Sequence, residues 1–400
     1  MNILLTIHET MGLNSGAAGS TLRLGETYQQ LGHEVSYFSI DNLPKAFQKL
    51  PFYLRKLVFP EFLAAYLVNR RARSFDVIDA STGDAWLWAA ISSTLSRMRK
   101  ISPLLVTRSH GLEHIYHHQY LAEAQRAIHQ PSWRYRFYRG GLQLWEVARS
   151  LKAADQIFVL NQHEKDYISQ HLSVPAANIY RVKNGMPSQF MQRPFEPALT
   201  LPNEPLRIAQ VGAYDPRKGV QYSVPALNRL LVRYPYLEVS FLGTACSLCP
   251  DAERVYADFD PAVRDRVTVI PHYSHEQLPE LLKGHHIKLF PTLCEGFSKA
   301  LIEGMACGLA PVTTYSPGPA DVVRHGLDGL MMPVRDEEAI ERALTELICD
   351  RTLLHELRQN AYATAQQYSW ESAARQRLSL YAEGLNNKSM KATRLSVSHL

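Results

Sequence analysis

The chain has 400 residues, and a single hydrophobic core usually stops growing well below that length, so two domains are expected. Hydrophobic residues make up 46% of the chain and charged residues 20%, the composition of an ordinary soluble globular protein. No stretch approaches the roughly 20 apolar residues that span a bilayer, and five cysteines, an odd number, argue against a disulfide framework.

The N-terminus indicates the compartment. Residues 2–7, Asn-Ile-Leu-Leu-Thr-Ile, lack the basic leader and the cleavage site of a signal peptide and are typical of a first β-strand. We therefore expect a cytoplasmic protein.

The charge is unevenly distributed along the chain. Residues 1–190 contain 21 Lys and Arg against 14 Asp and Glu, whereas residues 191–400 contain 22 against 24. A basic N-terminal half favours an anionic partner on that side. Within it, residues 45–59 and 69–73 mix basic with large apolar side chains, a composition that fits an element lying on an anionic membrane surface.

The segment 133–139, Trp-Arg-Tyr-Arg-Phe-Tyr-Arg, alternates aromatic residues with arginines. Three interpretations remain open: a helix with one aromatic face packed inside, a membrane contact, or a stacking surface for nucleic acid. The packed helix is favoured, and we expect no nucleic acid among the partners.

The first half of the chain alternates short β-rich runs with helical periodicity, as doubly wound domains do. A helix predicted over residues 20–31 ends at Gly32 and follows the first strand, so a β-α-β unit opens the protein. The predicted strands of this half lie at residues 3–7, 35–40, 77–80, 104–107 and 157–160.

A second alternation of strands and helices fills the other half. Residues 192–205 contain four prolines and little periodicity, so they are predicted to link two domains. Residues 339–349 are predicted to form one of the helices. The predicted strands of this half lie at residues 208–211, 239–242, 267–270, 287–290, 310–313 and 330–332.

These patterns predict an α/β fold with one domain at residues 1–191 and another at residues 206–370. Residues 371–385 are expected to form a C-terminal helix that packs back on the first domain. Residues 386–400 are polar and are expected to form a flexible tail.

The most informative pattern is a strand-to-helix turn at residues 286–307. Gly296 relaxes the turn, and residues 298–307 predict a helix that stops at Gly308. The first N–H groups of that helix lack intrahelical partners and can receive an anion. Glu295 lies just before the helix and Glu303 about one turn into it, so both carboxylates can accept hydrogen bonds from hydroxyls of a sugar or a ribose.

Glu295-Gly296-Phe297, a second glutamate eight positions after the first, and the following Met-Ala-Cys-Gly resemble the E-x7-E signature of the family-four retaining glycosyltransferases (glycosyltransferase group 1). Other segments resemble motifs of that family in the same order, over most of the chain. These are Asn184-Gly185, Gly212 with residues 217–219, the glycine-containing loops at 318–321 and 326–329, and the aromatic segment at 368–371. The resemblance implies a GT-B arrangement, in which two Rossmann-like domains face a central cleft.

The resemblance also implies roles for the residues of the block. Glu303 would hold the ribose of the nucleotide, and Glu295 would hold hydroxyls of the donor sugar. Backbone N–H groups of Phe297, Ser298 and Lys299, which follow Gly296, would meet the sugar and the phosphate. The family transfers its sugar with retention of the anomeric configuration.

A nucleotide-sugar donor needs positive charge beside its leaving diphosphate, and we expect Arg217 and Lys218 to supply it. Both follow Gly212, the phosphate-binding glycine of the family, in the loop after the strand at 208–211. The family more often has an arginine directly after this glycine, where the chain has Ala213. Arg217 either replaces that cation or points to solvent.

The N-terminal half supplies further candidates. Gly16 and Gly19 would let their loop approach the donor phosphates or the acceptor, or they form a surface turn. His110 follows the strand at 104–107 at its carboxyl end and matches the family's position beside the reacting sugar carbon. The predicted catalytic residues are thus His110, Arg217, Lys218 and Glu295.

Two short motifs are compatible with metal binding, and we reject both. Cys246-x-x-Cys249 lacks a second ligand pair. Asp258-Phe-Asp260 copies the D-x-D motif of the other large glycosyltransferase fold, but no buried strand flanks it and Pro261 follows directly. We expect no metal and no cofactor, because the nucleotide-sugar is a substrate.

Together these inferences favour a retaining hexosyltransferase that moves a sugar from a nucleotide-diphosphate-sugar to a glycan or lipid-linked acceptor. Bacterial cell-surface polysaccharide synthesis is the expected process, with the protein peripheral on the inner face of the cell membrane. Two alternatives remain: a nucleotide-sugar epimerase of the same fold, and a catalytically silent adaptor of a glycan-assembly complex.

Overall fold

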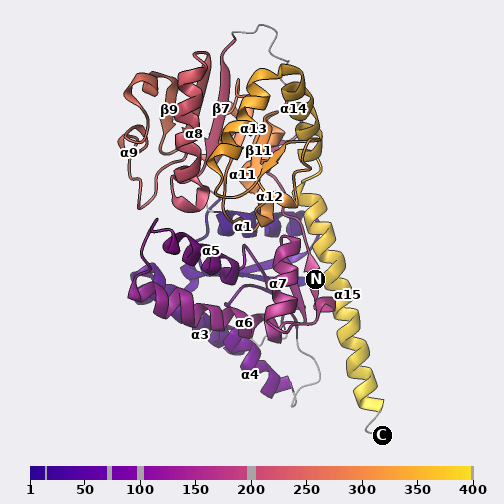
Figure 1. The fold of residues 1–400 in the computed structure, drawn as a ribbon. Coiled ribbons are helices and arrows are strands. Elements are labelled where there is room, and N and C mark those ends of the chain that lie inside the picture. The colour runs from indigo at the N-terminus through magenta and orange to yellow at the C-terminus, as the bar shows by residue number, and fades with distance from the viewer. Residues whose placement is uncertain (14–15, 70–73, 97–102, 196–203, 398–400) are drawn as a thin grey trace. The chain divides into compact units, whose positions relative to one another are not determined.

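The computed structural model describes residues 1–13, 16–69, 74–96, 103–195 and 204–397. The chain forms two compact units, the first made of Met1–Gly185 with the segment that begins at Trp370, the second of Met186–Ser369. Each unit is built on a six-stranded parallel sheet with helices around it (Figure 1), which confirms the predicted α/β class.

The sheet of the first unit has the strand order β2-β1-β3-β4-β5-β6. Its strands are β1 (Asn2–Ile7), β2 (Glu34–Ser39), β3 (Val77–Ser81), β4 (Leu104–Arg108), β5 (Gln156–Val159) and β6 (Ile179–Arg181). The sequence predicted all but β6. That edge strand is three residues long and buries only Ile179 fully, so it leaves no apolar run in the sequence.

Helices pack on both faces of this sheet. The helices are α1 (Gly16–Gln30), α2 (Lys45–Gln48), α3 (Phe52–Asn69), α4 (Trp86–Ser96), α5 (Glu113–Gln125), α6 (Gln143–Ala153), α7 (Gln162–His171) and α15 (Trp370–Val397), with short 3-10 turns at Ile40–Asn42 and Ala176–Asn178. Leu4 and Ile78 point into a core cluster with α3. Ile3 and Val77, one position earlier on the same strands, point into a second cluster with α1 and α15, as the period of a strand requires.

The aromatic segment 133–139 leads into a π-helical stretch at Tyr135–Leu142. Tyr138 is buried, whereas Trp133 and Phe137 are 73% and 70% exposed. The favoured packed-helix interpretation therefore holds for one aromatic side only, and the other side presents large apolar groups to solvent.

Helix α15 belongs to the first unit and packs against its core. Its Tyr381 hydroxyl donates to Asp79 and accepts a hydrogen bond of 3.1 Å from the Tyr28 hydroxyl of α1. The helix continues to Val397, where the sequence predicted a flexible tail from residue 386. One reason is Lys388, whose Nζ lies 2.6 Å from Asp155 Oδ2 and 2.8 Å from the Pro103 carbonyl oxygen.

The sheet of the second unit has the order β12-β11-β10-β7-β8-β9. Its strands are β7 (Leu206–Val211), β8 (Leu237–Leu242), β9 (Val267–Ile270), β10 (Ile287–Phe290), β11 (Ala310–Thr314) and β12 (Leu330–Met332), all of them predicted. Counted from β7, the order is the classical 3-2-1-4-5-6 of dinucleotide-binding domains. The strand order therefore reverses between β7 and β10.

The helices of the second unit also cover both faces of its sheet (Figure 1). They are α8 (Val220–Arg233), α9 (Glu253–Tyr256), α10 (Leu278–Leu281), α11 (Lys299–Ala306), α12 (Pro317–Ala320), α13 (Glu337–Cys349) and α14 (Arg351–Ala365), with 3-10 turns at Ser188–Phe190, Pro216–Lys218, Pro261–Arg266 and His275–Gln277. Ile208 packs with α8 and α13, whereas Ala209, the next residue of β7, packs with α11 and α14. Both faces of the sheet are thus buried, as in parallel sheets generally.

The chain passes between the units at two neighbouring points. The Met186 N–H donates to the Tyr368 carbonyl oxygen at 2.7 Å, and Met186 forms a parallel bridge with Ser369. The sequence placed the first boundary at residues 191–192, but Phe190 is fully buried in a core cluster of the second unit. Residues 196–203 of the expected linker lie outside the described residues.

Of the helices in the described segments, not one combines the length and the apolar character that a bilayer span requires.

Candidate functional site

The candidate site lies where the strand order of the second unit reverses. Open α/β sheets bind ligands outside the carboxyl ends of their strands at such a point. Here the loop after β7 carries Arg217 and Lys218, and the loop after β10 carries Glu295. The Leu293 N–H donates to the Arg217 carbonyl oxygen at 2.9 Å, so the two loops are joined through their backbones.

The turn Asp215-Pro-Arg-Lys-Gly219 holds the two cations in place. Asp215 caps it, with Oδ1 accepting from the N–H groups of Arg217 at 2.9 Å and Lys218 at 3.3 Å. Gly219 ends the turn at φ +74°, and a Cβ there would lie 2.0 Å from the Pro291 carbonyl oxygen. Only glycine permits this approach between the turn and the end of β10.

Glu295 is the common partner of both cations. Its Oε1 accepts a hydrogen bond from Arg217 Nη1 at 2.9 Å and a further one from Lys218 Nζ. Its Oε2 makes no hydrogen bond to any described residue. One oxygen is therefore fixed by the protein, and the other can accept from a ligand hydroxyl.

The charges around Glu295 favour its ionised form. Burial raises the pKa of this carboxyl, but the positive charges and hydrogen bonds of Lys218 and Arg217 outweigh burial, and the pKa is lowered overall. The carboxylate stays charged at neutral pH and partly neutralises the cations until a ligand arrives.

Glu303 lies on α11 and has its own anchor. Its Oε1 lies 2.8 Å from Nε2 of His275 and 3.9 Å from Nζ of Lys299. The side chain of Glu303 is 4% exposed. As in Glu295, the second carboxylate oxygen makes no hydrogen bond to a described residue.

The N-terminus of α11 follows Glu295 closely. The Ser298 side chain does not cap the helix, and its buried hydroxyl has no partner among the described residues. The N–H of Lys299 donates to the Phe297 carbonyl oxygen at 2.8 Å, so it is engaged within the turn. The N–H groups of Phe297 and Ser298 have no partner in the described part of the chain, which leaves two of the three expected backbone donors available.

Gly212 and Gly296 belong to the same site. Gly212 directly follows β7 and has φ +125°, and a Cβ there would lie 3.5 Å from Lys218 Cε, so the glycine lies beside the lysine stem. Gly296 is buried between Glu295 and Phe297. A Cβ placed on a third glycine, Gly318, would lie 2.8 Å from the Glu295 carbonyl oxygen. Only a residue without a side chain therefore lets this segment approach Glu295 so closely.

His110 belongs to the first unit, at the carboxyl end of β4. Arg108 Nε donates to its Nε2 at 3.3 Å, and Arg108 is itself buried and paired with Asp79 at 2.7 Å. Burial and the Arg108 charge hold the pKa of His110 well below its usual range. The ring is therefore neutral and carries its proton on Nδ1.

Gly16 and Gly19 lie in α1 of the first unit. Gly16 begins the helix and has open space where a side chain would stand. Gly19 is buried, and a Cβ there would lie 2.6 Å from the Leu13 carbonyl oxygen. The structure thus shows a packing reason for Gly19, whereas the approach of this loop to a ligand stays a prediction.

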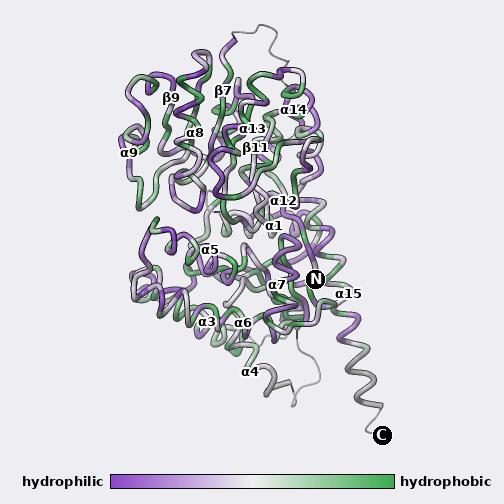
Figure 2. Tube along the Cα trace, viewed as in Figure 1, coloured by the Kyte–Doolittle hydropathy of each residue, from purple (hydrophilic) through white to green (hydrophobic). Residues whose placement is uncertain are grey.

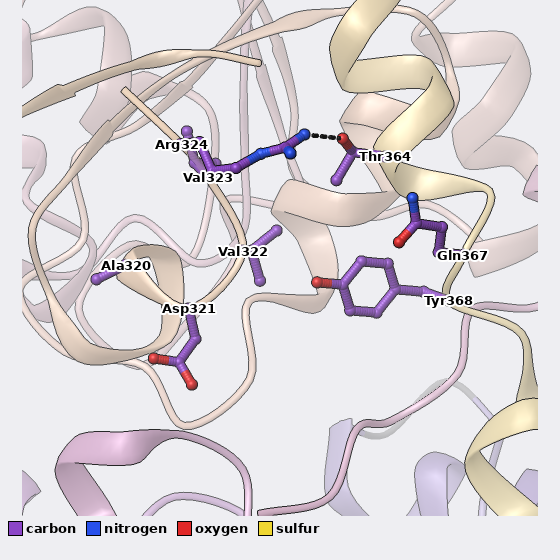
Figure 3. Close-up of a pocket in the computed structure, with 8 residues that line it drawn as sticks. All are labelled: Ala320, Asp321, Val322, Val323, Arg324, Thr364, Gln367 and Tyr368. Carbon is purple, nitrogen blue, oxygen red and sulfur yellow. Dashed lines mark hydrogen bonds between the residues drawn. The ribbon is translucent and has the colours of Figure 1, made fainter. Parts of the chain in front are cut away.

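The second unit contains a small cavity of about 220 Å³ (Figure 3). Its lining residues come from the α12 loop and the end of α14: Ala320, Asp321, Val322, Val323, Arg324, Thr364, Gln367 and Tyr368. Arg324 Nη2 donates to Thr364 Oγ1 at 3.1 Å on one side. The Tyr368 ring on the other side lies 6.0 Å from the ring of Phe297, so this cavity is a neighbour of the Glu295 site and contains none of its charged groups.

Sequence reasoning missed two residues of the site, His275 and Lys288. His275 begins a 3-10 turn marked by a capping box between Ser274 and Gln277, a local signal that says nothing of its contact with Glu303. Lys288 is a single charge inside the apolar strand Ile287–Phe290. That irregularity was visible in the sequence.

The two rejected metal motifs have other partners. Asp258 accepts hydrogen bonds from Tyr214 and Arg254, and the Sγ atoms of Cys246 and Cys249 lie near backbone carbonyl oxygens. Within the described residues, no group of three or more His, Cys, Asp or Glu side chains is arranged to hold a metal ion.

Family models match both units of the chain. The model described as glycosyl transferases group 1 matches residues 192–364, and the model described as glycosyltransferase family 4 matches residues 14–190. Among curated proteins, an exopolysaccharide phosphotransferase of Streptomyces coelicolor is 24% identical over 235 residues, which is 58% of this chain and 24% of that protein. The chain thus spans about a quarter of the length of this relative.

Several solved structures share the fold. A sucrose-phosphate synthase from Thermosynechococcus elongatus superposes with a TM-score of 0.71 at 20% identity, covering 96% of this chain and 98% of that one. HepE from Anabaena in complex with UDP-glucose superposes with a TM-score of 0.67 at 18% identity, covering 97% and 100%. With two Rossmann-like units, the E-x7-E carboxylates at the reversal point and family models that match each unit, the chain belongs to the group 1, family 4 glycosyltransferases of the GT-B fold.

Proposed function

We propose that the chain is a retaining glycosyltransferase that moves a sugar from a nucleotide-diphosphate-sugar to a glycan or lipid-linked acceptor in bacterial cell-surface polysaccharide synthesis. One observation carries the proposal. Two cations share the carboxylate of Glu295 just before α11, and the carboxylate of Glu303 lies about one turn into that helix. Each carboxylate keeps one oxygen that makes no hydrogen bond to a described residue.

The cations suit the diphosphate. Lys218 and Arg217 share a single oxygen of Glu295, and a diphosphate offers them a second anionic partner. The unpaired N–H groups of Phe297 and Ser298 lie at the positive end of the α11 dipole, which adds attraction for an anion.

The carboxylates suit the hydroxyls of the same ligand. We assign the open oxygen of Glu303 to the ribose and that of Glu295 to the sugar. A carboxylate accepts hydrogen bonds from adjacent hydroxyls without donating any, so both assignments need a hydroxyl-bearing ligand.

The proposed chemistry is a front-side displacement. The bond between the anomeric carbon and the phosphate oxygen breaks, and a bond from that carbon to the acceptor oxygen forms on the same face. The acceptor proton passes to the departing phosphate, whose growing charge Lys218 and Arg217 stabilise. Glu295 and Glu303 are binding groups here, and neither has to act as a general acid or base. We also carry over from the family resemblance a position for His110 beside the reacting carbon.

Several findings support the finer points. HepE was solved with UDP-glucose, which favours a UDP-hexose as the first donor to test. The Streptomyces coelicolor relative is described as an exopolysaccharide phosphotransferase, which favours a polysaccharide as product. We propose a cytoplasmic enzyme that needs neither metal nor cofactor, because Arg217 and Lys218 already provide two positive charges at the phosphates.

A membrane-facing element is proposed on the first unit. In α2, the turn after it and the start of α3, the side chains of Lys45, Lys49, Phe52 and Tyr53 are all exposed. Hydrophilic and hydrophobic segments follow one another around α3 (Figure 2), and elements that lie on anionic membranes combine both kinds of residue. Lys56 is different, since burial lowers its pKa and Glu113 and Asp84 face it. Residues 70–73 lie outside the described residues.

The decisive experiment is a donor screen. UDP-, GDP- and ADP-sugars are compared by thermal stabilisation, because a ligand that binds only the folded state raises the melting temperature. The stabilising donor is then incubated with lipid extracts, and the anomeric configuration of the product is read by NMR. Retained configuration with activity unaffected by EDTA supports the proposal. Isomerisation of the donor sugar without an acceptor would indicate an epimerase, and binding without any turnover would indicate an adaptor.

Flotation with anionic liposomes tests the membrane element. We expect the parent protein to float at low salt and to be released at high salt, since charge attraction is screened. The double variant Lys45→Glu, Lys49→Glu should stay at the bottom, whereas Lys283→Glu, at an exposed lysine of the second unit, should float like the parent. A parent protein that never floats removes the membrane element.

A further inference from the structure

Lys288 is an unusual residue for the middle of a sheet. It lies in β10 between Ile287 and Leu289, its side chain is fully buried, and its Nζ makes no hydrogen bond to any described residue. Lysines are almost never fully buried without a partner, because an ammonium group loses its hydration there. Such a costly group points to a function.

The fold makes room for this side chain at one place. A Cβ on Gly304 of α11 would lie 2.9 Å from Cγ and Cδ of Lys288, so the helix passes directly over the lysine stem. Gly304 directly follows Glu303. The lysine therefore fills a space under the helix turn that carries Glu303, the proposed hydrogen-bond acceptor for the ribose.

The amine and Lys218, the proposed diphosphate cation, lie close to the same aromatic ring. The Nζ of Lys288 lies 5.9 Å from the centroid of Phe290, and the Nζ of Lys218 lies 5.4 Å from the same centroid. The charged or titratable groups that face Lys288 are Glu303 and Cys307 from α11 and its end, and Lys218 from the turn after β7. His285, just before β10, also interacts with the charge of Lys288. Its partners on the flanking strands are Ala209 and Pro311, neither of which titrates.

These surroundings set the charge of the amine before a ligand binds. Burial lowers the pKa of Lys288 well below its usual range, Glu303 raises it and Lys218 lowers it further. The net effect favours the neutral amine. Because the site is enclosed, a change in nearby charge acts on it with little screening.

We propose that Lys288 is a positioning residue of the donor site that takes up a proton from solvent when a nucleoside diphosphate binds. This rests on the proposed function, since it requires that the diphosphate meets Lys218. A bound diphosphate brings about two negative charges and turns the surroundings of Lys288 from repelling to attracting a proton. The resulting ammonium then attracts both Glu303 and the diphosphate, and so stabilises the liganded arrangement of α11.

Calorimetry measures this proton directly. UDP, GDP and ADP are titrated into the protein at one neutral pH, in phosphate and in Tris, which differ in ionisation enthalpy. We expect the observed binding enthalpy to differ between buffers by the amount that corresponds to uptake of up to one proton per site. In Lys288→Met, which keeps the length and apolar stem of the side chain, binding should persist with the buffer difference largely lost.

Linkage gives a second readout. Because the proton is bound more tightly in the complex, the affinity of the parent for the nucleotide should fall as the pH rises above neutral. The affinity of Lys288→Met should fall less. Lys288→Gln provides the same comparison if the methionine variant fails to fold.

Two controls separate Lys288 from other proton acceptors. Lys283→Met makes the same chemical change at an exposed lysine upstream of β10 and should retain the buffer difference. His275→Gln removes the ring that is hydrogen-bonded to Glu303 and should retain it too. A difference that survives in Lys288→Met and vanishes in His275→Gln overturns the inference, as does nucleotide binding by the parent with no buffer difference. If none of the three nucleotides binds, the proposed function itself fails and the inference with it.

Discussion

Arg217 and Glu295 form an ion pair of 2.9 Å that joins the loop after β7 to the loop after β10, across the point where the strand order reverses. Lys218 uses the same carboxylate oxygen. Before a ligand binds, Glu295 therefore holds both cations of the site.

This pair gives a prediction that separates phosphate binding from sugar binding. Glu295→Gln removes a negative charge beside the two cations, so we expect UDP to bind as tightly as before or several-fold more tightly. Turnover of the nucleotide-sugar should fall at least tenfold, because the ligand of the sugar hydroxyls loses its charge. Calorimetry with UDP and a steady-state assay measure the two effects. Weaker binding of UDP would contradict the assignment of Glu295 to the sugar.

Glu303→Ala should weaken the binding of every nucleoside diphosphate that binds the parent. Hydrogen bonds to a charged group contribute roughly 1.5 to 3 kcal/mol, so affinity should drop at least tenfold. A matched 2′-deoxynucleotide provides the comparison. It should bind the parent more weakly than the ribonucleotide does, whereas the variant should bind the two nucleotides with nearly equal affinity. An unchanged dissociation constant in a folded variant would remove Glu303 from the site.

Lys218→Ala should slow turnover more than it weakens binding, because the positive charge of Lys218 stabilises the negative charge that develops on the leaving phosphate. Loss of a comparable stabilising group elsewhere costs about 10²- to 10³-fold in turnover. Lys218→Arg should restore only part of the rate, because a planar guanidinium places its charge differently from a compact ammonium. A turnover number within twofold of the parent for the alanine variant would exclude this role.

Glu146 in the first unit should make stability depend on pH. Burial raises its pKa to about 8, and the charges of Glu61 and Asp84 add to this effect while Lys56 opposes it. A raised carboxyl pKa means that the folded state prefers the proton, so its stabilising contribution is full below about pH 4.5 and is lost as the pH rises toward 8. Glu146→Gln mimics the neutral form. The difference in melting temperature, variant minus parent, should therefore increase as the pH is raised from 4.5 to 8. A difference that stays constant over this range would refute the raised pKa of Glu146.

Tyr381 should anchor α15 through its hydroxyl. Tyr381→Phe removes the donor to buried Asp79, and the loss of a hydrogen bond to a charged group costs roughly 1.5 to 3 kcal/mol. Tyr28→Phe removes the next hydroxyl, which donates to Tyr381 and not to the carboxylate, and should cost less. Urea unfolding, followed through the transition of the first unit, compares the two. Equal losses would show that Asp79 is held by Arg108 alone.

The sequence predicted most of the fold because buried parallel strands are short apolar runs between turn residues. Such runs predicted every strand of the second unit, including Ile287–Phe290 despite its lysine. The edge strand Ile179–Arg181 escaped because it is half solvated. The end of α15 was wrong for a different reason, since Lys388 finds Asp155 far away in the sequence.

The site was predictable where one stretch of chain carries it. Glu295, Glu303 and the turn between them lie within one strand-to-helix unit, and the turn at Arg217 and Lys218 has its own capping signals. Contacts between residues far apart in the sequence produce no local sequence pattern. Neither the ion pair of Arg217 with Glu295 nor the support of Glu303 by His275 follows from local pattern, because each depends on which strands become neighbours.

The chain leaves the first unit before Met186 and returns to it after Ser369, so the second unit is an insertion in the first. The ends of this insertion already touch, since the Met186 N–H reaches the Tyr368 carbonyl oxygen at 2.7 Å. A segment whose ends meet can be cut out, recircularised or exchanged with little loop-closure entropy to overcome. The unit that holds the E-x7-E carboxylates can thus be exchanged as one segment, by replacing residues 186–369 with the equivalent stretch of a relative.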